Sequence, residues 1–197
     1  MLWDKHMLYN VWNKVYRLDI IRENNIFFPK YNFGEDMDFN IEYLKYVNRF
    51  YNSSTPYYHY IKERMNSITT KYNDRLFEIR IKEYYKFNSY LKEQGLEGEK
   101  SREFSSRRFL ERAIGCIENI CGSDLRLSVK RDKVKLICTN KLVIETIKIA
   151  KFKSIKMKIL VTLVESKNIT LIYLFFRSVS IIRKRFPNIF NKLKNSR

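Results

Sequence analysis

Three carboxylates stand together in residues 34–40, Gly-Glu-Asp-Met-Asp-Phe-Asn, within an otherwise basic chain. We expect Glu35, Asp36 and Asp38 to open a helix, because apolar residues recur at helical spacing after them. A carboxylate held there can take the proton of an attacking hydroxyl group, as sugar transfer from a nucleotide-sugar requires. Acids also favour the first turn of any helix because of its dipole, and the acids alone favour this structural explanation.

Other motifs accompany these acids in order along the chain. They are Trp-Asn-Lys-Val-Tyr-Arg at 12–17, Asn-Asn-Ile-Phe-Phe-Pro at 24–29, Pro-Tyr-Tyr-His-Tyr at 56–60 and Asn-Ser-Ile-Thr at 66–69. With the acids between them, the series resembles the C-terminal part of the catalytic domain of family-two glycosyltransferases, which adopt the GT-A fold. The resemblance covers residues 8–72. It favours a catalytic role for the acids over a purely structural one.

The resemblance implies specific roles. Asp36 would be the catalytic base, and Glu35 beside it would bind the acceptor or orient the base. Trp12, Asn13 and Lys14 would lie on the acceptor side of the cleft.

A loop over residues 60–67 would cover the active site, with Tyr60 binding substrate and Arg64 contacting the donor diphosphate. The alternative is that Arg64 is a solvated surface residue, as most arginines in loops are. Tyr58 and Tyr60 fall on one face of an expected strand, where their rings could stack on a sugar or pack in the core.

The donor half of the family's catalytic domain does not precede residue 12. The complete family enzyme is expected to use a divalent metal, Mg or Mn, on the donor diphosphate, with ligands that are not in this chain. Asp36 and Asp38 have the Asp-x-Asp spelling, but they fall within a helix, so we assign no metal site to them. We therefore expect a truncated form or a split-gene product that is inactive alone.

The helices and strands expected from the sequence predict an α/β fold, a partial GT-A type with few strands, followed by a mostly α-helical C-terminal region. Residues 1–72, the C-terminal part of a glycosyltransferase catalytic domain, would contain strands at 8–16 and 57–61, helices at 17–25 and 35–48, and a buried extended piece at 26–29. Residues 73–197, a basic extension, would contain helices at 74–94, 104–120, 130–150, 155–164 and 169–185.

The charge of the chain is concentrated in its last third. The net charge is +18, and residues 141–197 contribute +12 of it, from 14 basic and two acidic residues. Lysines interleave with apolar residues over 148–185, a pattern typical of attachment to an anionic membrane surface. A solvated face on packed helices remains the alternative, and nucleic-acid binding is not favoured because no nucleic-acid module is recognisable.

Cysteine and histidine usage indicates the compartment. Cys116, Cys121 and Cys138 form neither a disulfide framework nor a zinc motif, so a reduced, cytoplasmic setting is expected. The two histidines, His6 and His59, make no metal site. The longest apolar run, in 169–182, falls short of the roughly 20 residues of a spanning helix, so we expect a cytoplasmic protein that is peripheral on the inner face of the membrane.

The sequence leaves three functions open. The first is a glycosyltransferase fragment in polysaccharide or cell-surface glycan assembly, with a nucleotide-sugar donor and a glycan or lipid-linked acceptor. The second is a non-catalytic membrane-associated or partner-binding remnant. The third and weakest is a basic nucleic-acid-binding protein.

Overall fold

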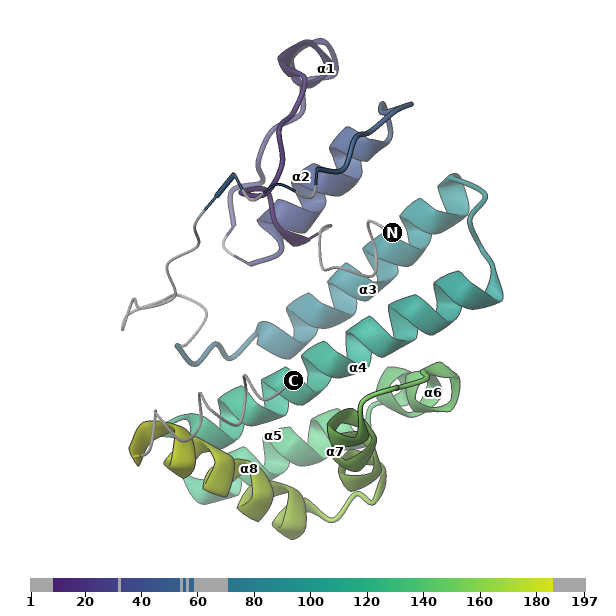
Figure 1. Cartoon of the computed structure of the whole chain (residues 1–197). Helices are drawn as coiled ribbons and strands as arrows, with labels where there is room; N and C mark the ends of the chain where they lie inside the picture. Colours follow the sequence, from purple (N-terminus) through teal and green to yellow (C-terminus); the bar gives the residue numbers. More distant parts are fainter. Residues whose placement is uncertain (1–8, 32, 54, 56, 59–70, 186–197) are drawn as a thin grey trace. The chain divides into compact units, whose positions relative to one another are not determined.

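The structure is a computed structural model, and it describes residues 9–31, 33–53, 55, 57–58 and 71–185. All regular elements within these residues are α-helices (Figure 1). They are α1 (Leu18–Glu23), α2 (Glu35–Leu44), α3 (Leu76–Glu93), α4 (Glu99–Gly122), α5 (Leu127–Cys138), α6 (Lys141–Ile149), α7 (Ile155–Glu165) and α8 (Ile169–Arg185).

The predicted α/β fold, a partial GT-A type, is wrong, because the described part of the chain holds no strand. The segment expected as a strand at 8–16 turns at Val11, whose carbonyl accepts from the Lys14 amide at 3.2 Å. Two of its neighbouring amides find side chains of α2 instead of a partner strand. Val11 N donates to Asp36 Oδ2 at 3.3 Å, and Arg17 N donates to the Tyr43 hydroxyl at 2.8 Å. Helix side chains thus supply hydrogen bonds that a sheet would otherwise supply.

The second expected strand, at 57–61, is also not formed in its described part. Tyr57 and Tyr58 lie outside any regular element, and residues 59–61 are outside the described residues. Residues 26–29 likewise belong to no regular element, and of these only Ile26 is buried.

The helical predictions are confirmed with shifted ends. The helix expected at 35–48 starts at Glu35 but ends at Leu44. The helix expected at 130–150 is two helices, α5 and α6, divided at Thr139 and Asn140. Asn140 caps α6, because its Oδ1 accepts from Leu142 N at 2.9 Å. This cap starts a new helix at Lys141, so a segment with one continuous apolar pattern forms two helices.

The chain forms two compact units. Unit 1 comprises Met1–Met65 and Lys82–Leu96, and unit 2 comprises Asn66–Ile81 and Glu97–Arg197. Helix α3 therefore contributes residues to both units. The division into domains 1–72 and 73–197 that the sequence suggested stays a prediction.

The core of unit 1 holds the N-terminal segment against α2. Ile26, Phe39 and Tyr43 are its buried members. The ring of Tyr16, from the irregular segment, meets Phe39 and Tyr43 edge-on, with centroids 5.3 and 5.0 Å apart. Burying these rings fixes the segment that carries residues 11–17 on the helix that carries the acids.

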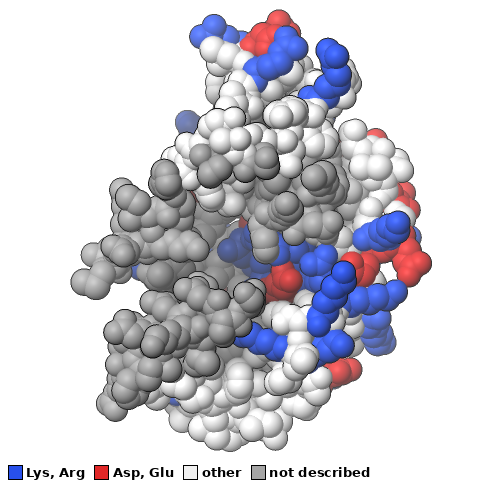
Figure 2. Space-filling model, in the orientation of Figure 1, with Lys and Arg blue, Asp and Glu red and all other residues white. Residues whose placement is uncertain are grey.

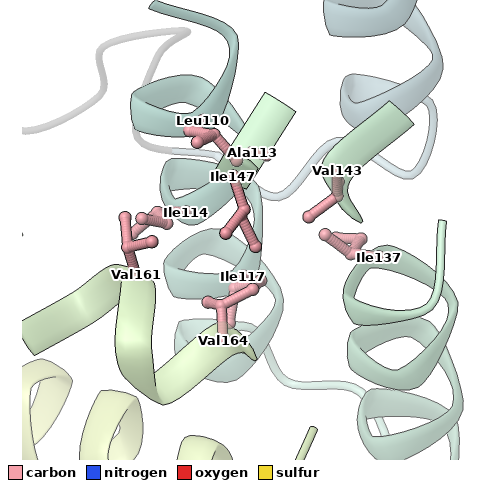
Figure 3. Close-up of a pocket in the computed structure, with 9 residues that line it drawn as sticks. All are labelled: Leu110, Ala113, Ile114, Ile117, Ile137, Val143, Ile147, Val161 and Val164. Carbon is pink, nitrogen blue, oxygen red and sulfur yellow. The ribbon is translucent and has the colours of Figure 1, made fainter. Parts of the chain in front are cut away.

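Unit 2 is a helical core built around α4, which packs against α5, α6, α7 and α8. Figure 3 shows the aliphatic side chains that converge between α4, α5, α6 and α7. They are Leu110, Ala113, Ile114, Ile117, Ile137, Val143, Ile147, Val161 and Val164. The space among them has no room for a water molecule, so we interpret it as packing and not as a ligand site. Among the described helices, none has the length and apolar character needed to cross a membrane.

The start of α2 depends on one glycine. Gly34 is the N-cap of α2 and has a φ of 89°, a left-handed conformation that L side chains adopt with strain. A Cβ at this position would lie 2.9 Å from Glu83 Oε1, and Glu83 is buried. The conformation therefore disfavours other residues at this position, and an added Cβ would require the Glu83 carboxylate to shift.

We predict that Gly34→Ala destabilises unit 1 by about 2 kcal/mol, because left-handed strain of roughly 1 kcal/mol adds to the contact with Glu83. Gly95→Ala is the matched control, since Gly95 also has positive φ (65°) but has no atom within 4 Å of an added Cβ. Gly95→Ala should be destabilised by the left-handed strain alone. Urea unfolding of both variants measures the difference, and equal losses would contradict the role of the contact with Glu83.

Candidate functional site

The predicted base and the predicted acceptor-side residues meet in unit 1. Asp36 is half-buried in the first turn of α2, and its Oδ2 accepts from Val11 N at 3.3 Å. The two residues are 25 positions apart in sequence. The chain thus brings Asp36 beside the segment that contains Trp12, Asn13 and Lys14, the neighbours that the sequence had associated with it.

Burial changes the acidity of Asp36. Partial burial raises its pKa above the ordinary value of 3.8, and the charge of Glu35 raises it further. The hydrogen bond from Val11 and the charge of Lys14 act in the opposite direction and are outweighed. A carboxylate with a raised pKa is a stronger proton acceptor than a solvated one.

Lys14 is the basic group of the site. Its ammonium group donates to Asn13 Oδ1 at 3.0 Å and to the carbonyl of Asn10. Burial lowers the pKa of Lys14 from 10.5 to about 8, although the charge of Asp36 partly opposes this shift. Asn13, predicted to bind the acceptor, here orients the lysine.

The half-buried Tyr16 and the buried Asn40 form hydrogen bonds beside the site. Tyr16 donates its hydroxyl to Asn40 Oδ1 at 2.6 Å, and Asn40 Nδ2 donates to the carbonyl of Asn10 at 3.3 Å. Burial raises the pKa of Tyr16, and the charge of Asp36 adds to the effect. Sequence reasoning missed both residues. The available signal was Asn40 itself, four residues after Asp36 and therefore on the same face of the helix.

Trp12, which follows Val11 in sequence, forms an aromatic pair with Tyr58. The rings of Trp12 and Tyr58 have centroids 5.2 Å apart at an interplanar angle of 33°. Both side chains are exposed, Trp12 to 40% and Tyr58 to 56%. Exposed rings of this kind are suited to stacking on a sugar, since they present an apolar face to solvent.

The acids of α2 do not fit a divalent metal. Asp36 is held by the amide of Val11, whereas Asp38 Oδ1 forms an ion pair with Lys86 Nζ of α3 at 2.9 Å. Bound cations need several oxygen ligands, and Lys86 already provides the positive charge at Asp38. The described residues contain no cluster of three or more His, Cys, Asp or Glu side chains that could hold a metal, so no metal is assigned to this site.

Several predicted site residues cannot be placed. Tyr60 and Arg64, predicted to bind substrate, lie outside the described residues, as do His6 and His59. Their roles stay predictions.

No protein-family model, no curated protein and no solved structure matches the chain. A GT-A fold requires a sheet, and the described residues form helices alone among regular elements. The assignment of residues 8–72 to the family-two glycosyltransferases is therefore wrong.

We predict that Asp36→Asn stabilises unit 1 at neutral pH. An acid with a raised folded-state pKa binds its proton more readily when folded, so stability decreases as pH rises through that pKa. The amide avoids this cost and still accepts from Val11. The gain should disappear as pH falls toward the ordinary pKa of an aspartate.

Asp38→Asn is the control on the same helix. It loses the ion pair with Lys86 and should cost about 0.5–1 kcal/mol. Chemical unfolding as a function of pH measures both variants. A destabilising effect of Asp36→Asn at neutral pH would show that the folded state favours the charged carboxylate.

We predict that the stability of unit 1 increases between pH about 8 and 10.5, because the half-buried Lys14 loses its proton there in the folded state first. The increase should be about 1–2 kcal/mol, less than the full shift in pKa implies, because solvent screens the partly exposed ammonium group. Lys14→Met should remove it, and Lys30→Met, at an exposed lysine of the same unit, should retain it. A pH profile of Lys14→Met that parallels the unsubstituted chain would contradict this prediction.

Proposed function

We propose that unit 1 carries the acceptor side of a sugar-transfer site, with Asp36 as the base. One observation carries the proposal: a partly desolvated carboxylate is anchored by the Val11 amide and faces the charge of Lys14. Trp12 directly follows Val11 in sequence, and its exposed pair with Tyr58 supplies a surface for a sugar ring.

In the proposed reaction, the acceptor hydroxyl donates its proton to a carboxylate oxygen of Asp36. The acceptor oxygen forms a bond to the anomeric carbon of the donor sugar while the bond from that carbon to the diphosphate oxygen breaks. The nucleoside diphosphate leaves with the electron pair, and the configuration at the anomeric carbon inverts. Glu35 acts on Asp36 through its charge, which raises the base's pKa.

Donor binding is not assigned to the described residues. We therefore propose that the chain binds a glycan or lipid-linked acceptor but does not turn over a nucleotide-sugar by itself, and that it serves polysaccharide or cell-surface glycan assembly. A cytoplasmic location on the inner face of a membrane is proposed with it. The exposed Lys148, Lys153, Lys156 and Lys158 support this location, because they can meet anionic lipid headgroups.

A binding unit without catalysis is the second candidate. The exposure of Trp12 and Tyr58 favours it, since two rings can hold a sugar without any proton transfer. The two candidates differ in what Asp36 does. A base must accept a hydrogen bond from the sugar hydroxyl, whereas a binding unit does not need this contact.

We predict that sugars bind more weakly as pH falls through the folded-state pKa of Asp36, because protonation removes a charge-assisted hydrogen bond. Trp3→Phe leaves Trp12 as the reporter, since the chain has two tryptophans. Indole fluorescence is followed during titration with a panel of mono- and disaccharides. Asp36→Asn should abolish the pH dependence, and Glu35→Gln should retain it.

Tyr58→Ala in the same background should weaken binding about threefold to tenfold, through loss of stacking. Unchanged pH dependence in Asp36→Asn would refute the base and leave the binding unit. Failure of every sugar to give saturable binding would refute both candidates.

A further inference from the structure

Helix α8 has two apolar faces, and the protein covers one of them. Ile172 and Phe176 are buried, and the helix packs on α4 and α5. The contact with α4 is close: a Cβ added at Gly122 would lie 3.3 Å from Ser180 Oγ. The orientation of α8 within unit 2 is therefore fixed by its inward face.

The outward face of α8 carries an apolar stripe, which the exposed Ser178 interrupts between Phe175 and Ile181. Large side chains at i, i+3, i+4, i+10 and i+11 fall on one side of a helix. In α8 these are Leu171, Leu174, Phe175, Ile181 and Ile182, all of them exposed. Leu171 and Leu174 expose 51% and 58% of their surface. Exposed apolar patches of this extent mark interaction surfaces.

Charge identifies what the stripe, Leu171–Leu174–Phe175–Ile181–Ile182, would meet. Elsewhere in unit 2 basic side chains stand beside acids, as in Lys151–Glu99 at 3.4 Å and Lys133–Asp74 at 2.6 Å. Figure 2 shows the same mixture of blue and red on the face in view. From Ser166 to Arg197, by contrast, the sequence holds eight basic residues and no acid. The stripe thus belongs to a segment that attracts an anionic surface.

We infer that the outward stripe of α8 inserts into the headgroup region of an anionic lipid bilayer. The helix, about 25 Å long, would lie in the plane of the interface, because no described helix is suited to crossing a membrane. A second copy of this chain is the poorer occupant. A two-fold contact would bring two equally basic segments face to face. The inference does not depend on the sugar-transfer proposal.

Vesicle flotation tests the inference on the full chain. Vesicles of phosphatidylcholine with phosphatidylglycerol are compared with phosphatidylcholine alone. We expect at least about tenfold stronger partitioning to the anionic vesicles, and a decrease at high salt. Leu171→Ser with Leu174→Ser should weaken this partitioning by roughly tenfold, since it removes two large apolar groups from the stripe.

Leu127→Ser with Leu136→Ser is the matched control, at two exposed leucines of α5 in the same unit. It should leave partitioning unchanged. Equal binding to neutral and anionic vesicles would overturn the inference, as would full retention of binding by the α8 double variant or an equal loss in the control. A dimer that the α8 double variant dissociates, without vesicle binding by the unsubstituted chain, would assign the stripe to a second copy.

A gain-of-signal measurement removes dependence on the double variant's folding. Leu174→Trp should show a blue-shifted emission and quenching by brominated lipid on anionic vesicles. Leu136→Trp should show neither effect. Equal responses at the two positions would overturn the insertion of α8.

Discussion

The hydrogen bond from the Val11 amide to the Asp36 carboxylate is the constraint on which unit 1 depends. It joins an irregular N-terminal segment to the first turn of α2, over a separation of 25 residues. The segment has no partner strand among the described residues, so its amides depend on α2 side chains, with Tyr43 accepting from Arg17 N as well. The same bond fixes the position of Asp36 and opposes the increase in its pKa, so structure and acidity are set together.

The backbone and side chains around the start of α2 are restricted in conformation. Gly34 takes a left-handed conformation that places the acids of α2, and the buried Asn40 one turn later fixes Asn10 and Tyr16. Lys14 is held by oxygens of Asn10 and Asn13, and burial lowers its pKa to about 8. The pKa of Asp36 is raised and that of Lys14 is lowered, so the fold disfavours the charged form of both groups. Such a cost is typical of sites that are kept for chemistry.

Local patterns in the sequence predicted the helices well, because apolar periodicity and the residues at helix ends act over a few positions. The acids at Glu35, Asp36 and Asp38 do open α2, and Asn140 shows why one predicted helix is two. The strands were mispredicted, because alternation in 8–16 reports burial of residues such as Tyr16 and not the presence of a partner strand. The resemblance associated Asp36 with Trp12, Asn13 and Lys14, whereas the contribution of Tyr16 and Asn40 could be recognised only in the fold. Their role depends on hydrogen bonds over 24 and 30 residues.

The two units differ in the side chains that they bury and expose. Unit 2 buries aliphatic side chains around α4 and leaves an apolar stripe outward on α8, whereas unit 1 keeps its polar groups half-buried around Asp36. The central claim concerns Asp36 and is tested most directly by carboxyl-carbon NMR, with the resonance assigned through its loss in Asp36→Asn. The account predicts a pKa above 3.8 that decreases when a sugar binds, because the sugar hydroxyl stabilises the charged form. A pKa at or below 3.8 that no sugar changes would contradict it.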